Sequence, residues 1–153
     1  MGVNRVDDHL LYWILLGMQT LGVSILFWYG VPHYREVLRD PAAHEFGLGV
    51  FLWAMPSIAL MQLGYWYSFR RRLFPPEFDQ PLIAHVVMCL ARFGFVLASG
   101  VFSLVFLAPK PFSIPVGRSV LTIIVLFSVF CYTLELQRFG QALLGPSQQQ
   151  RRT

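Results

Sequence analysis

Residues 82–108 read LIAHVVMCLARFGFVLASGVFSLVFLA and decide the fold of this chain. The run is 27 residues long and holds one permanent charge, Arg92, ten residues after Leu82. A tilted helix needs roughly 20 apolar residues to cross a bilayer, so this run is long enough to span one. A guanidinium near the bilayer midplane costs about 2.5 kcal/mol or more, and we therefore expect Arg92 to face protein rather than lipid.

The composition of the whole chain also indicates a membrane protein. Hydrophobic residues make up 56% of the 153 residues and charged residues 13%, against roughly 25% charged in an ordinary soluble domain. The mean hydropathy is +0.55. The net charge of +4 is modest and no basic face accompanies it, so the expected partners are membrane lipids and other membrane proteins, and nucleic acid is not among them.

Apolar runs of similar length recur along the chain and predict further membrane spans. Tyr12 and Trp13 mark the start of the first run and Trp28 and Tyr29 its end, as expected for aromatic residues at the two headgroup levels. The fold class predicted is an all-α integral membrane protein, with four transmembrane helices in an antiparallel bundle and both termini on the same side. A single domain, residues 1–144, would contain spans at about 10–30, 46–69, 82–108 and 118–140, followed by a polar, disordered tail at 145–153.

The basic residues predict the orientation of these spans. Seven fall on the side of the termini and four on the other side: Arg5, Arg70, Arg71, Arg72, Arg138, Arg151 and Arg152 against Arg35, Arg39, Lys110 and Arg118. Lysine and arginine concentrate in cytoplasmic loops. We therefore expect a multi-pass protein of a bacterial inner membrane with cytoplasmic N- and C-termini.

The third and fourth spans each carry a polar stripe at helical spacing. The residues are His85, Cys89, Arg92, Ser99 and Ser103 in the third span, and Ser128, Cys131, Glu135 and Arg138 in the fourth. Since a short connector joins these spans, we expect their stripes to face each other. Gly94 and Ala98 form a small-xxx-small pair, which permits close helix approach. Whether Cys89 and Cys131 touch is left open.

Four polar residues of the spans form a predicted layer inside the bundle: Arg92, Glu135, Gln19 and Gln62. A direct pair between Arg92 and Glu135 would bridge an offset in depth of about 10 Å, so Gln19 and Gln62 are better matched as partners of Arg92. One alternative is that this layer only holds the bundle together. The other is that Arg92 receives an anion or a polar ligand, such as a lipid phosphate, a carboxylate substrate or a quinone carbonyl.

Histidines offer a second candidate constellation. His9 and His85 lie at matched depth near one end of two spans and are candidate axial ligands of a b-type haem. His33 and His44, in the loop predicted at residues 31–45, follow no metal-ligand spacing, so no metal site is predicted there. No nucleophile–base pair is recognisable along the chain, which argues against an enzyme.

These observations rank three functions. The first is a non-enzymatic membrane subunit that assembles with other membrane proteins or with itself, binds lipid and needs no cofactor. The second is a small oligomeric transporter or channel with Arg92 and Glu135 along its path. The third is a redox anchor that binds haem or quinone through His9, His85 and Arg92.

Overall fold

The computed structural model describes residues 3–39, 48–73, 75, 79–107 and 116–144. These residues form four helices and no strand, as predicted. The helices are α1 (Val3–Arg39), α2 (Leu48–Arg71), α3 (Pro81–Phe106) and α4 (Val116–Ala142).

Three of these helices contain segments long and apolar enough to cross a membrane, which supports a membrane protein. The segments are Asp8–Pro32 in α1, Pro81–Ser103 in α3 and Ser119–Ala142 in α4. Within the described residues, no segment of α2 reaches the same combination of length and mean hydropathy. A fourth span through α2 therefore stays a prediction.

Helix α1 differs from the expected first span in its length. A loop was expected from residue 31, whereas the helix continues through Pro32 to Arg39. Proline removes one backbone hydrogen bond, yet its fixed φ angle is compatible with a helix, so the chain need not leave the helix there. His44 and the tail at 145–153 lie outside the described residues.

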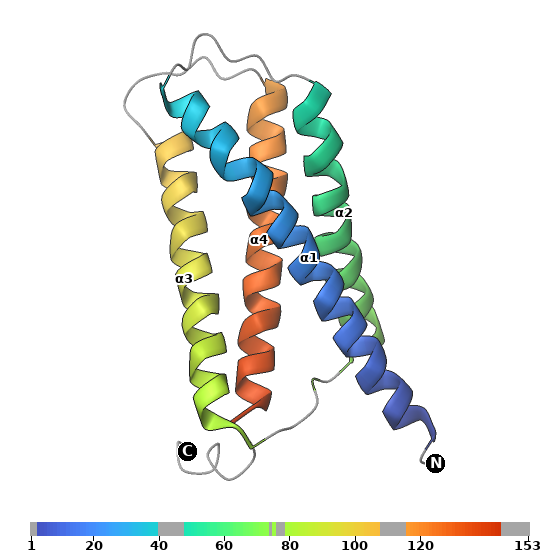
Figure 1. Cartoon of the computed structure of the whole chain (residues 1–153). Coiled ribbons are helices and arrows are strands. Elements are labelled where there is room, and N and C mark those ends of the chain that lie inside the picture. Colours follow the sequence, from blue (N-terminus) through green and yellow to red (C-terminus); the bar gives the residue numbers. More distant parts are fainter. Residues whose placement is uncertain (1–2, 40–47, 74, 76–78, 108–115, 145–153) are drawn as a thin grey trace.

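The helices pack as two pairs joined through α4. Helix α1 packs along α2, and α3 packs along α4. Helix α4 also contacts α2 and, over a shorter length, α1. Figure 1 shows α1 running obliquely across α2 and α4, with α3 at the edge of the molecule. Helix α4 is therefore central and α3 peripheral.

Two glycines let α1 and α2 approach closely. A Cβ atom at Gly22 would lie 2.7 Å from the Ser57 carbonyl oxygen, and one at Gly64 would lie 2.7 Å from Cγ of Gln19. Real Cβ atoms essentially never approach other heavy atoms this closely. The α1–α2 pair therefore depends on the missing side chains at these two positions.

The α3–α4 pair is built in the same way. Ala84, Ala91 and Ala98 recur every seven residues on α3 and are all buried. A Cβ atom at Gly94 would lie 3.0 Å from Cγ2 of Thr133, and one at Gly140 would lie 2.6 Å from Cγ of Met88. Small residues on both helices thus permit the contact, and the close approach predicted at Gly94 is confirmed.

The start of α3 and the end of α4 lie together at one end of the molecule. The backbone amide of Gln80 donates to the Leu143 carbonyl oxygen at 3.1 Å. An apolar cluster surrounds this junction and includes Tyr12, Leu16, Ala84, Phe139, Leu143 and Leu144. Tyr12 and Phe139 bring α1 and α4 together here, with ring centroids 6.3 Å apart.

Candidate functional site

The polar stripe of α4 lies in the interior of the bundle. Ser128, Cys131 and Glu135 are all buried. The Gln62 side-chain amide donates to Ser128 Oγ at 2.9 Å, and the Trp66 indole N–H donates to Gln62 Oε1 at 2.9 Å. The stripe therefore faces α2 at this level.

Glu135 is the most deeply buried charged side chain of this stripe, with 2% of its surface exposed. Ser68 Oγ donates to Glu135 Oε1 over a long distance of 3.5 Å. Arg138 Nη1 lies 3.7 Å from Glu135 Oε2, although Arg138 itself is half-exposed. The hydroxyl of Tyr12, from α1, lies within electrostatic reach of the same carboxylate. Three helices thus enclose Glu135, and the side chain of its cationic neighbour Arg138 reaches the surface.

Several polar atoms in this interior lack hydrogen-bond partners among the described residues. They are Oη of Tyr12, both side-chain amide atoms of Gln19, Oε2 of Glu135 and Nδ1 of His9. Gln19 is 1% exposed and packs against Gly64. An unpaired buried amide or hydroxyl costs about 1–3 kcal/mol in a protein interior, so these groups lower the stability of the bundle.

A further hydrogen bond joins α1 to α4. The hydroxyls of Thr20 and Tyr132 lie 3.1 Å apart. Neither residue was predicted for the polar layer, and neither were Tyr12 or Ser68. The interior position of Tyr12 could have been predicted from helical spacing. Positions 12, 16 and 19 share one face of the helix, and Gln19 was already expected in the interior.

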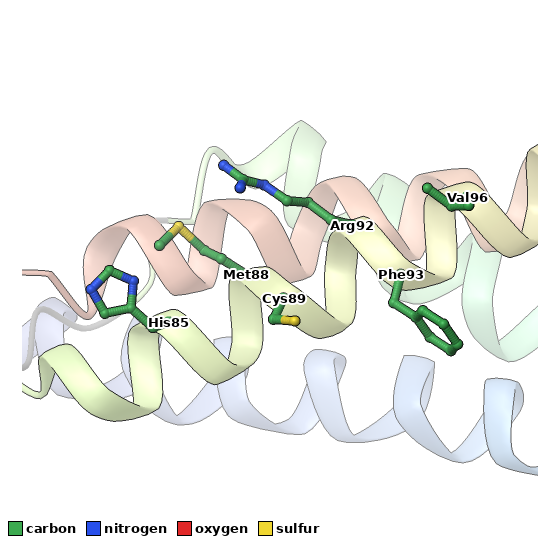
Figure 2. Close-up of a pocket in the computed structure, with 6 residues that line it drawn as sticks. All are labelled: His85, Met88, Cys89, Arg92, Phe93 and Val96. Atoms are coloured by element: carbon green, nitrogen blue, oxygen red, sulfur yellow. The ribbon is translucent and has the colours of Figure 1, made fainter.

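The polar stripe of α3 lies on the surface of the molecule, on the side of α3 that faces away from α4. His85, Cys89 and Arg92 are exposed, and Arg92 has no hydrogen bond or ion pair within the part of the chain that the structure describes. Together with Met88, Phe93 and Val96 they line a pocket of about 520 Å³ on α3, and Figure 2 shows these six side chains along the helix. The expectation that the stripes of the third and fourth spans face each other is therefore wrong.

The alanines of α3 explain this outcome. Two helices gain the most van der Waals contact where small side chains let their backbones approach. Ala84, Ala91 and Ala98 offer α4 a smoother surface than the larger His85, Cys89 and Arg92 could. The helix therefore turns its alanines toward α4, and its polar stripe faces outward.

The predicted polar layer is accordingly divided. Gln19, Gln62 and Glu135 lie in the interior formed by α1, α2 and α4. Arg92 is exposed on α3 and pairs with none of them. Arg92 and Glu135 thus differ both in depth and in the side of the bundle on which they lie. Neither residue therefore neutralises the other within one chain.

The histidines and cysteines also fall in different surroundings. His9 is partly buried at the start of α1, whereas His85 is exposed on α3 and the residues that line its pocket do not include His9. Cys89 is exposed and Cys131 is buried, and both are free thiols. The structure therefore offers two separate candidate sites, a buried carboxylate site around Glu135 and an exposed cationic pocket around Arg92.

No known protein family model matches this chain, and no curated protein or solved structure matches it either.

Proposed function

We propose that this chain is a non-enzymatic integral membrane subunit that assembles with a partner through the outward face of α3. In this proposal all four helices cross a bacterial inner membrane as an antiparallel bundle, with both termini in the cytoplasm. The junction of Gln80 with Leu143 supports antiparallel packing of α3 and α4, and the excess of arginines on one side supports the orientation.

The observation that carries the proposal is the position of Arg92. It lies eleven residues after Pro81, deep inside the apolar segment Pro81–Ser103. A guanidinium that faces lipid at the bilayer centre costs from about 2.5 to more than 10 kcal/mol. An exposed Arg92 in an isolated chain is therefore unfavourable in a bilayer, and a partner that covers it would remove this cost.

The rest of the α3 surface suits assembly as well. Phe93 and Val96 are large, apolar and exposed beside Arg92, and Met88 completes an uneven surface into which another helix can pack. Only 17% of the α3 segment is buried within the chain, against 33% of the segments in α1 and α4. Lipid tails would cover whatever the partner leaves exposed.

Native mass spectrometry of the protein, extracted from its host membrane in a mild detergent, tests this function. We expect an assembly heavier than the 17.5 kDa chain, with bound lipid. Arg92→Leu should abolish the assembly while the helical content and thermal unfolding of the monomer stay unchanged, because Arg92 is exposed and makes no hydrogen bond or ion pair with the described residues. Leu63→Ala, at an exposed position of α2, is the control and should assemble normally. A lipid-free monomer of the unmodified protein would contradict the proposal.

A further inference from the structure

We infer that the partner at the α3 face is a transmembrane helix of a different protein, which carries an aspartate or glutamate near the bilayer midplane. The inference rests on the proposed assembly through α3 and specifies the chemistry of its partner. Three observations favour this occupant over a lipid headgroup or a second copy of the chain.

The first observation is the depth of Arg92. The eleven residues from Pro81, at the nearer end of the apolar run, to Arg92 correspond to about 16 Å of helix. This distance is longer than an arginine side chain, even though Figure 2 shows Arg92 extending along α3 toward the end that carries His85. A phosphate at the headgroup level is therefore out of its reach unless the bilayer thins locally. A carboxylate on a neighbouring helix can lie at the depth of the guanidinium itself.

The second observation concerns the acidic residues of this chain. Of its eight aspartates and glutamates, only Glu135 lies well inside an apolar segment. Glu135 is buried between α1 and α2 and already interacts with Ser68 and Arg138. A second copy therefore offers Arg92 no exposed carboxylate at the right depth.

The third observation is the symmetry of self-association. In a two-fold dimer through α3, the same surface meets itself, so the two Arg92 side chains approach each other. Two guanidinium groups in a medium of low dielectric constant repel each other strongly. A carboxylate is the opposite case, because arginine binds it through two parallel hydrogen bonds with matching geometry.

The pocket provides the remaining contacts for such a helix. Met88, Phe93 and Val96 are apolar and line the same pocket as Arg92, so they can pack against leucine or valine side chains near the partner's carboxylate. Cys89 is exposed one turn from Arg92 in the same pocket. Its thiol is a built-in reporter for whatever covers this face.

The test uses the full chain reconstituted in phosphatidylcholine vesicles with leucine-rich peptides matched to the 23-residue α3 segment. Each peptide carries Glu, Gln or Lys at its centre and a cysteine one turn to either side. After mild oxidation, disulfide formation with Cys89 measures contact at the α3 face. Cys131 is replaced by serine so that only Cys89 reports.

We expect the Glu peptide to form the disulfide about tenfold more than the Gln or Lys peptide. Arg92→Gln should remove this preference, and Arg92→Glu should transfer it to the Lys peptide. The exchange of preference separates a direct charge pairing from a general loss of folding, since a misfolded protein would lose contact with all three peptides.

Other outcomes would overturn the inference in distinguishable ways. Equal disulfide yields with the Glu and Gln peptides would leave assembly through α3 intact but remove the acidic partner. A dominant Cys89–Cys89 dimer that tolerates Arg92→Gln would indicate a second copy instead. Phosphatidylglycerol that purifies with the unmodified protein and not with Arg92→Gln, together with no preference among the peptides, would indicate a lipid headgroup. If Cys89 formed none of these products, assembly through α3 would itself fail.

Discussion

Helices α3 and α4 are similar in sequence pattern and opposite in their packing. Both are long, at 26 and 27 residues, and both carry an apolar segment with a stripe of polar residues at helical spacing. Helix α4 buries its stripe, with Ser128, Cys131 and Glu135 enclosed by α1 and α2, whereas α3 exposes Cys89 and Arg92. A polar stripe on an apolar helix thus does not by itself tell which face meets the rest of the protein.

The difference follows from how many neighbours each helix has. Helix α4 contacts all three other helices, and α3 packs mainly along α4. A helix with several neighbours buries more than one face, so its polar groups find partners inside, as Ser128 does with Gln62. A helix with one neighbour buries only its best-fitting face, which in α3 is the alanine face.

The largest expected effect contrasts two phenylalanines. Phe139 on α4 is 8% exposed and its ring lies 5.2 Å from that of Trp13, while Phe93 on α3 is 61% exposed. Phe139→Ala should lower the free energy of unfolding by about 3 kcal/mol through the cavity it leaves. Phe93→Ala should change it by less than about 0.5 kcal/mol. Unfolding in mixed dodecylmaltoside and dodecylsulfate micelles, followed by tryptophan fluorescence, measures both. Equal losses would mean that α3 does not expose this face in the monomer.

An intermediate effect is expected from filling two glycines. Leucine at Gly140 would clash with Met88, whereas a Cβ atom at Gly100 on α3 would have nothing within 4 Å. Gly140→Leu should therefore destabilise the monomer by about 1–3 kcal/mol through overpacking of the α3–α4 contact. Gly100→Leu should leave the thermal midpoint in detergent unchanged. Should Gly140→Leu unfold at the same temperature as the unmodified protein, α3 would not pack on α4 as described.

The smallest expected effect concerns two serines. Ser128 accepts a hydrogen bond from Gln62 of another helix, while Ser99 on α3 donates to the Phe95 carbonyl oxygen of its own helix. Ser128→Ala should cost about 0.6 kcal/mol, the average for interhelical hydrogen bonds in membranes, and Ser99→Ala should cost less. A double-mutant cycle of Ser128→Ala with Gln62→Leu isolates the pair. A coupling energy of zero would show that this hydrogen bond contributes nothing to the α2–α4 contact.

Much of the fold could be predicted because it depends on local properties of the chain. The length and composition of residues 82–108 are enough to predict a helix at that place, and the structure has one at Pro81–Phe106. The end of α1 was harder to predict, since Pro32 is compatible with both a loop and a continuing helix. Gly94 was correctly assigned to a close helix contact, because the absence of a side chain is visible in the sequence itself.

The arrangement of the candidate sites was less predictable. Glu135 was identified as an intramembrane charge, but its surroundings of Tyr12 and Ser68 come from two other helices far away in the chain. Helical spacing places residues on a common face of one helix and carries no information about which neighbour meets that face.

The pattern of residues along the chain is enough to predict that this protein is built from long apolar helices and that one of them carries a single arginine deep inside it. The packing of the helices against one another places Arg92 on the outside of the bundle and Glu135 on the inside. The rotation of a helix about its axis follows from the fit of whole helix surfaces, and a single side chain has little influence on it. The packing of Ala84, Ala91 and Ala98 against α4 fixed the rotation of α3. Arg92 therefore lies on the outer face of that helix.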